Sequence, residues 1–440
     1  MKRKMALFLF AAVLVASMFS ACGAEKAPSG NTSSPSGDVQ SPTAQTGSAP
    51  VETKKLKIVS QMFYDPLQQQ YVKENVLPKF KEQTGIDVDL QVVANASDLY
   101  KTLEAQQSTG NWTTDLLITH DSAAVDTVKK YNAVAAYDWQ PQGTFITQFD
   151  DNFIVDGKRY YIPLQADVYV LIANKKALPY LEELGYDIND LTWDQLAQWG
   201  NNIKAKTGTP RYVFPALAGK FAAYEFNAIQ LSYGAKYVPV FNTPEAKKAF
   251  DIIAGMKNAI LPSSPTIDFP TTPLASEEAW ITVFHQGYAY TTYNQAPDKY
   301  VIAPVPKGDD GYRGTIAGGH GIGIVAGSPN KEAAKKFVEF MLQDDVLYDI
   351  MSQTGPWIPS KQEVLSKLGT NPADDIMKMG LQTLTGNSRI DRVRSSEYQD
   401  YGLVKALYES TFADILAGRT IDQAYLDAKQ AELEKLKVSQ

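Results

Sequence analysis

The stretch "KLKIVSQMFYDPLQQQYVKENVLPKFKEQTGIDVDLQVVA" (residues 55–94) decides the fold class of this 440-residue chain. Within it, 55–61 has a short apolar strand pattern, 65–85 carries apolar residues at helical spacing up to Gly85, and 86–94 alternates as a strand does. The same signals predict a helix and then a strand in the next residues, at 97–110 and 114–119. This strand–helix–strand–helix–strand order predicts an α/β protein with a mostly parallel sheet flanked by helices.

A second series of elements follows from residue 160 onward. The helix pattern at 191–208 opens on a capping box of Thr192 and Gln195 and closes on Gly208. Further helices are expected at 243–258 and at 328–343, the latter with a Ser328 cap and Pro329 in its first turn. Extended segments are expected at 160–178, 300–308 and 321–327, and the last hundred residues read as helical. A chain of this length exceeds what one core usually organises, so we expect two domains.

The N-terminus has the plan of a secretory signal. Three basic residues at positions 2–4 precede an apolar run at 5–19, which is shorter than a membrane span needs. Ser20 and Ala21 then precede Cys22, the single cysteine of the chain. This arrangement resembles the lipobox of bacterial lipoproteins, although Phe19 stands where leucine is usual. We expect a signal peptide at 1–21, a lipidated Cys22, and a disordered tether rich in Pro, Gly, Ser and Thr at 22–54.

Composition excludes several classes of function. Hydrophobic residues make up 44% and charged residues 21%, as in a soluble globular protein. The formal net charge is −7 without a basic stripe, which argues against a nucleic-acid partner. One cysteine excludes an internal disulfide and a thiolate zinc site. We expect no cofactor and a monomer.

Known catalytic motifs are missing. The chain has three histidines, and neither a nucleophile elbow, nor a zinc-protease motif, nor a P-loop occurs. The segment "GIGIVA" (321–326) has the letters of a dinucleotide fingerprint, but its glycines lie inside an extended run rather than after a strand. His320 in "AGGHGIG" has two readings: a turn that uses Gly318 and Gly319, or a close approach of a ligand to the backbone at these glycines.

Candidate ligand-binding residues follow the predicted strands. Ligands of open α/β sheets bind beyond the carboxyl ends of the strands, where this chain places Tyr64, Asp65, Asp121 and Asp167. Aromatic residues also fall in turns, and Trp357 in "GPWIPS" is the strongest candidate because it stands between two prolines. Aromatic faces stack on sugar rings while carboxylates and amides bind hydroxyls, so this residue set is typical of a carbohydrate site.

These blocks together resemble the solute-binding proteins of bacterial ABC importers, in the family that includes maltodextrin-binding protein. The resemblance covers roughly residues 55–360 and is carried by blocks such as "TDLLITHDSAAV", "YYIPLQADVYVLIANKKAL", "FHQGYAYTTYN" and "GGHGIGIVAGSPNKEAAKKFVEFML". It implies two α/β lobes of the type II periplasmic-binding-protein-like fold, joined by crossover strands near "PLQADVYV" and "APVPKG". The first lobe would comprise 55–166 plus 303–357, and the second 167–302 plus 358–440.

The same resemblance implies a function without catalysis. A small solute, a mono- or oligosaccharide, would bind between closing lobes and pass to the permease subunits, with the protein anchored by its lipid on the outer face of the bacterial cytoplasmic membrane. The positions that match the ligand-binding residues of sugar-binding relatives are Asp121, Asp167, Tyr224 or Phe226, Tyr293, Gly319 with His320, and Trp357.

Two alternatives stay open at this point. Asp65, Asp121, Asp167 and Glu225 could line an acidic cleft for a cationic or metal-containing solute such as a polyamine or an iron chelate. A lipid-anchored surface glycosidase that uses two carboxylates is the other.

Overall fold

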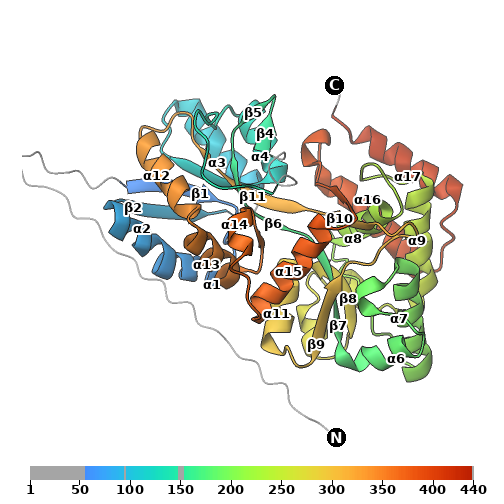
Figure 1. The fold of residues 1–440 in the computed structure, drawn as a ribbon. Helices are drawn as coiled ribbons and strands as arrows, with labels where there is room; N and C mark the ends of the chain where they lie inside the picture. The colour runs from blue at the N-terminus through green and yellow to red at the C-terminus, as the bar shows by residue number, and fades with distance from the viewer. Residues whose placement is uncertain (1–54, 94–95, 147–152, 439–440) are drawn as a thin grey trace, which may run out of the picture. The chain divides into compact units, whose positions relative to one another are not determined.

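The computed structural model describes residues 55–93, 96–146 and 153–438. The expected signal peptide, Cys22 and tether therefore lie outside the described residues. The described chain folds around a six-stranded sheet and a three-stranded sheet (Figure 1). Within the described ranges, no helix is long and apolar enough to cross a membrane.

The six-stranded sheet has the order β12-β6-β11-β3-β1-β2. Its strands are β1 (Lys55–Ser60), β2 (Asp87–Val92), β3 (Leu116–His120), β6 (Ile162–Asp167), β11 (Gly318–Ile324) and β12 (Ile358–Pro359). The helices associated with it are α1 (Pro66–Tyr71), a π-helical segment (Val72–Val76), α2 (Leu77–Thr84), α3 (Ala96–Thr109), α4 (Asp121–Lys129), α12 (Lys331–Met341), α13 (Asp344–Thr354) and α14 (Gln362–Leu365).

Alternation along these strands explains why helices cover both faces. Ile58 and Leu116 point into a core with Phe80 and Phe337 from α2 and α12. Their neighbours, such as Val59, point the other way, into a core with residues of α3 and α4. Successive side chains of a strand lie on opposite faces, so a strand that is apolar throughout needs a helical layer on each side.

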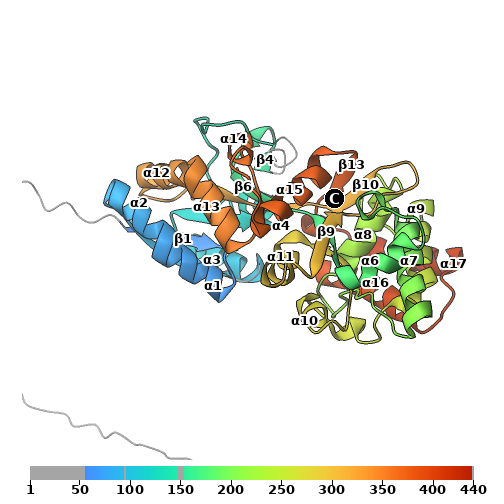
Figure 2. The ribbon, with the colours of Figure 1, turned by 60° about the horizontal axis from the view of Figure 1, so that its bottom comes forward.

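The three-stranded sheet has the order β8-β7-β9, with β7 (Tyr169–Asn174) in the centre between β8 (Ile281–His285) and β9 (Tyr300–Pro304). The helices around it are α6 (Leu178–Glu182), α7 (Trp193–Thr207), α8 (Ala222–Ser232), α9 (Pro244–Met256), α10 (Thr271–Ala275), α11 (Gln286–Gln295), α15 (Pro372–Thr385), α16 (Tyr401–Leu416) and α17 (Gln423–Lys435). Figure 2 shows several of them gathered around β9. Two short sheets pair β10 (Arg313–Ile316) with β13 (Ser388–Asp391) and β4 (Ile154–Val155) with β5 (Lys158–Arg159).

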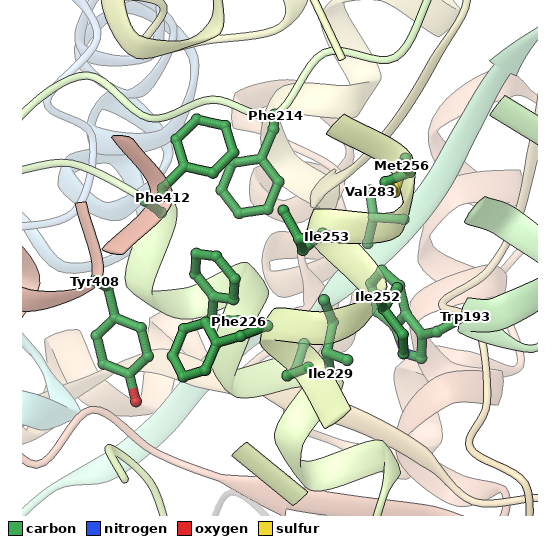
Figure 3. Packing of buried hydrophobic residues seen from close by; sticks show 14 of the residues in the cluster. Trp193, Phe214, Phe226, Ile229, Ile252, Ile253, Met256, Val283, Tyr408 and Phe412 are labelled. Carbon is green, nitrogen blue, oxygen red and sulfur yellow. The ribbon is translucent and has the colours of Figure 1, made fainter. Parts of the chain in front are cut away.

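Aromatic side chains pack α16, the second-last helix of the chain, against α8 and the segment before it. Phe412 of α16 stacks on Phe214 with ring centroids 4.4 Å apart, and Tyr408 lies 5.8 Å from Phe226 of α8 (Figure 3). Stacked and tilted aromatic pairs add to the free energy gained by burying their area. This packing makes the last part of the chain a structural component of the region around the three-stranded sheet.

The predicted strand directions were only partly right. β1 pairs in parallel with β2 and β3, as the sequence order predicts. β11 runs antiparallel to both β3 and β6, and every pairing of the three-stranded sheet is antiparallel. The sheets are therefore not mostly parallel. β11 comes from a segment about 200 residues after β3, and strand alternation carries no information on direction between such distant partners.

Local boundaries also differ in places. The helix after β11 begins at Lys331 with Asn330 as its N-cap. The Ser328 hydroxyl donates to Asp115 at 2.6 Å and accepts a hydrogen bond from the Asn330 amide at 3.0 Å, so Ser328 lies two residues earlier than the N-cap does. The expected helix at 65–85 is interrupted by the π-helical segment just before Pro78, which has no N–H to continue the helical ladder. The predicted capping box of α7 is present, and Gly208 ends that helix in the left-handed conformation.

Candidate ligand-binding site

The polar residues of the candidate site lie at or near the ends of three neighbouring strands, β3, β6 and β11. In β11, His320 is paired with His120 of β3 on one side and with Gln165 of β6 on the other, and Gly318 is paired with Asp167. Val168 alone separates β6 from β7, so the chain crosses from the six-stranded to the three-stranded sheet directly after Asp167. Residues from both sheets therefore meet beside this crossing.

The first carboxylate belongs to Asp121, the first residue of α4. It is 2% exposed, and its Oδ1 lies 2.9 Å from Nδ1 of His120. His120 is the N-cap of α4. Its Nδ1 accepts a hydrogen bond from the Ser122 amide at 3.2 Å when the ring nitrogen is unprotonated, and it donates to Asp121 when Nδ1 carries a proton. Burial lowers the pKa of His120, but the charge and hydrogen bond of Asp121, with the charge of Asp167, outweigh burial and raise it.

The second carboxylate belongs to Asp167, at the end of β6. It is 4% exposed, and its Oδ2 lies 2.5 Å from Nδ1 of His285, which ends β8. The ring of His285 also packs 5.7 Å from the ring of Tyr169. A histidine from the three-stranded sheet thus contacts an aspartate from the six-stranded sheet.

His320 lies between these two pairs. Its Nδ1 is 2.7 Å from the Gln165 amide nitrogen, and its ring makes an edge contact with His120 at 5.3 Å. Burial lowers the pKa of His320 well below its ordinary value, and the neighbouring His120 and His285 lower it further. His320 is therefore a neutral hydrogen-bonding group at physiological pH.

Several buried polar atoms of this group have no hydrogen-bond partner among the described residues. Nδ1 of His285 is one of them, because its 2.5 Å contact with Asp167 lacks hydrogen-bond geometry. Three others are Oδ1 of Asp167, Oε1 of Gln165 and the hydroxyl of Tyr169. Nearly all buried polar atoms in native proteins are hydrogen-bonded, and leaving one unsatisfied costs about 1–3 kcal/mol. A polar molecule that supplied hydroxyl groups here would satisfy all three.

An aromatic wall adjoins the polar group. We define it as Phe221, Phe269, Phe284 and Tyr288, whose rings contact one another at 4.6–6.5 Å. Tyr288 also lies 5.7 Å from His285, which joins the wall to the Asp167 pair. The wall offers apolar ring faces next to hydrogen-bonding groups.

The chain matches a family model for bacterial extracellular solute-binding proteins over residues 65–347. It belongs to this family. Among the solved structures that resemble this solute-binding protein, maltose-bound MalE3 of T. maritima has a TM-score of 0.68 at 20% identity and covers 87% of this chain and 99% of that one. The GacH receptor of Streptomyces glaucescens, solved unliganded and with acarbose, has a TM-score of 0.67 at 15% identity, covering 88% and 98%. An ABC substrate-binding protein of Listeria monocytogenes in complex with cycloalternan has a TM-score of 0.66 at 19% identity, covering 87% and 99%.

The curated relatives match a smaller part of the chain. A binding protein of Brucella abortus (strain 2308) is 28% identical over 252 residues, which is 53% of this chain. A binding protein of Brucella suis biovar 1 matches to the same extent. This chain spans about 58% of the length of these relatives. The structural likenesses confirm the predicted two-lobed α/β fold of a solute-binding protein.

Some of the predicted ligand-binding residues of this solute-binding protein lie close together in the structure. Asp121, Asp167 and His320 belong to the polar group, and the neighbouring Gly319 faces the backbone of Gln165. Trp357 is 8% exposed, and its indole nitrogen and the Asp167 carboxylate flank Gly287 at 2.9 and 3.1 Å from where a Cβ would stand.

Tyr224 and Glu225, at the start of α8, lie near the same group. The Tyr224 ring is 6.3 Å from Phe221 of the aromatic wall. Glu225 is buried and accepts a hydrogen bond from the Tyr212 hydroxyl. Burial raises the pKa of Glu225 well above its ordinary value and so favours its neutral form.

Three other predicted residues lie elsewhere. Tyr64 is 43% exposed. The Asp65 carboxylate is the N-cap of α1, where it accepts a hydrogen bond from the Leu67 amide at 2.8 Å. The Tyr293 hydroxyl lies 3.5 Å from Asp375 of α15.

The turn reading of "AGGHGIG" was wrong, because Gly318–Ile324 is strand β11. Its glycines make room for rings instead: a Cβ on Gly318 would stand 2.6 Å from Nε2 of His120, and one on Gly321 would stand 2.8 Å from the ring of Phe153. Glycine is needed here for close approach and not for a positive φ.

Sequence reasoning missed four residues of the site. His120 precedes Asp121 in "THD", and His285 opens "FHQGY", so proximity to a strand end could have singled out both. Gln165 lies two residues before Asp167. Lys405 of α16 had no such signal, yet its charge acts on His120 and its Nζ lies 5.1 Å from the centre of the Tyr224 ring. Among the described residues, no group of three or more potential ligands could hold a metal ion.

Proposed function

We propose that this solute-binding protein captures a mono- or oligosaccharide and delivers it to the permease of an ABC importer. The observation that carries the proposal is the set of unsatisfied buried atoms on Asp167, Gln165 and Tyr169 beside the aromatic wall. Sugar hydroxyls can donate to the two acceptors and bond the tyrosine hydroxyl, while the C–H face of the ring packs on the aromatic rings.

Solved relatives support a carbohydrate. The structures from T. maritima, S. glaucescens and L. monocytogenes contain maltose, acarbose and cycloalternan, respectively. At 15–20% identity these likenesses support the fold, and the choice of sugar depends on the side chains of this chain.

The transport cycle would use closure of the two lobes. We place the first lobe at 55–166 plus 303–357 and the second at 167–302 plus 358–440, with hinges at the crossover segments. Asp121 and Asp167 would bind the sugar, and a ligand that contacts both lobes would favour the closed state. An affinity near micromolar, about −8 kcal/mol, permits both capture and release.

Membrane attachment would come from the N-terminus. Cleavage before Cys22 and acylation of its thiol would anchor the protein on the outer face of the cytoplasmic membrane, with 23–54 as a tether. Mass spectrometry of the native N-terminus tests this. A mature chain that does not begin at an acylated Cys22 would contradict it.

A thermal-shift screen of the purified protein tests the ligand class. We expect maltose, or another neutral sugar among glucose, galactose and mannose, to raise the melting temperature, because a ligand at 100 times its Kd adds about 2.7 kcal/mol of stability. Spermidine and a ferric chelate serve as probes of the cationic and metal-containing classes. A shift with either of these and none with any sugar would contradict the proposal, as would hydrolysis of the sugar.

A further inference from the structure

All three histidines of the chain lie in the candidate site. His120 and His320 make ring contact across β3 and β11, and His285 acts electrostatically on His320. Three histidines scattered at random over a chain of this length would rarely meet at one point. Their grouping therefore calls for a role in the chemistry of the site.

Each aspartate of the site is matched to one of these histidines. The His120–Asp121 pair is at 2.9 Å and the His285–Asp167 pair at 2.5 Å. The third histidine, His320, is bonded to the neutral Gln165. Acid and imidazole thus occur in pairs, one on each side of His320.

Other titratable groups also lie around the histidines. They include Tyr169 from β7, Glu225 from α8, Tyr288 from α11 and Lys405 from α16. Burial raises the pKa of Glu225 and of both tyrosines, which favours the neutral form of each group. Lys405 adds one positive charge near His120. The two aspartates therefore face Lys405 and the histidines.

We propose that the histidines are specificity-determining residues, which occupy one oxygen of Asp121 and one of Asp167 so that the site selects an uncharged solute and rejects a cationic one. The inference rests on the proposed function, because it names the charge class of the solute bound at the same site. A buried ammonium group needs an unbalanced carboxylate, since a buried charge without a partner is costly. Here His285 already holds Oδ2 of Asp167, which leaves Oδ1 to accept a hydrogen bond from a neutral hydroxyl.

The pairing can be tested without any ligand. Because the chain has three histidines, the NMR spectrum of the full chain with ¹⁵N-labelled histidine contains three pairs of imidazole nitrogen signals, assigned with the single His→Gln variants. We expect His120 to gain its proton as the pH falls through a value above 6.5, while His320 stays neutral to well below it. In Asp121→Asn, the pKa of His120 should fall. If His320 is protonated before His120, or if Asp121→Asn leaves His120 unchanged, the charge matching is refuted.

Selectivity is tested with matched sugars. Isothermal titration at pH 6.5 compares glucose, galactose and mannose with their 2-amino-2-deoxy counterparts. We expect the wild type to prefer the neutral member of the bound pair at least about tenfold, and His285→Gln to lose at least about tenfold of that preference. The control is Tyr288→Phe, which keeps His285 and should keep the preference even if both affinities change.

The outcomes separate this inference from the proposed function. An equal preference in wild type and His285→Gln, or a wild type that prefers the amine, overturns the inference while sugar binding stands. If none of the sugars binds, the proposed function fails, and the histidine titration alone decides whether the charges are matched.

Discussion

Replacing Asp167 by asparagine gives the sharpest mutational test of the site. The change keeps the size of the side chain and removes its charge, and one oxygen acceptor becomes an amide donor. Asp167 has one oxygen against His285 at 2.5 Å and one buried oxygen with no partner in the described chain. A hydrogen bond to a charged group contributes about 1.5–3 kcal/mol, so the loss of one bond to the sugar should weaken binding by about 10- to 150-fold.

Stability should change much less than affinity. The His285 side chain is 25% exposed, so water can replace the lost contact, and we expect a change within about 1 kcal/mol, or roughly 2 °C in the melting temperature. The assay is isothermal titration of both proteins with the sugar that gives the largest thermal shift. Asp251→Asn, which removes an exposed acid paired with Lys247 on α9, is the matched control and should bind normally. A loss of less than threefold in Asp167→Asn, with the fold intact, would refute the reasoning.

Three further predictions concern the site and its scaffold. Gly318→Ala places a methyl group 2.6 Å from Nε2 of His120, so sugar affinity in isothermal titration should fall at least about tenfold, whereas Gly255→Ala, with open space around it, should have no effect. Glu225→Gln should raise the melting temperature more at pH 8 than at pH 4: the pKa of Glu225 is raised in the folded state, so the wild type loses stability as the pH rises above the unfolded value, and an equal gain at both pH values would contradict this. Thr192→Ala removes the capping-box hydroxyl of α7 and should cost about 1 kcal/mol in urea unfolding; no change in the midpoint would contradict the cap.

Elements with local signals could be predicted from the sequence. The helix α7 could be predicted because its end signals are local: the capping box lies in its first turn at Thr192, and Gly208 directly follows its last residue. β1 and β2 were predicted by the same kind of reading. The direction of β11 could not be predicted, because its neighbours β3 and β6 lie far away in the sequence and strand alternation is the same in either direction.

In the candidate site, too, contacts between residues far apart in the sequence could not be predicted. Asp121 and Asp167 could be proposed because both stand at or just after strand ends, where ligands of α/β proteins bind. That each is paired with a histidine depends on contacts across strands and between sheets, and these contacts leave no short-range pattern. Lys405 enters from a helix near the C-terminus for the same reason. Asp65 shows that position after a strand is not specific for ligand binding, since an acid there can equally serve as the cap of the next helix.

The measurement that tests the central claim most directly is isothermal titration of the purified protein with the neutral sugars of the screen, followed by analysis of the recovered sugar. The account predicts one sugar bound per chain at near-micromolar affinity, a change in tryptophan fluorescence through Trp357, and chemically unchanged sugar at the end. Heat of binding with spermidine or a ferric chelate and none with any sugar, or the release of hydrolysed product, would contradict it.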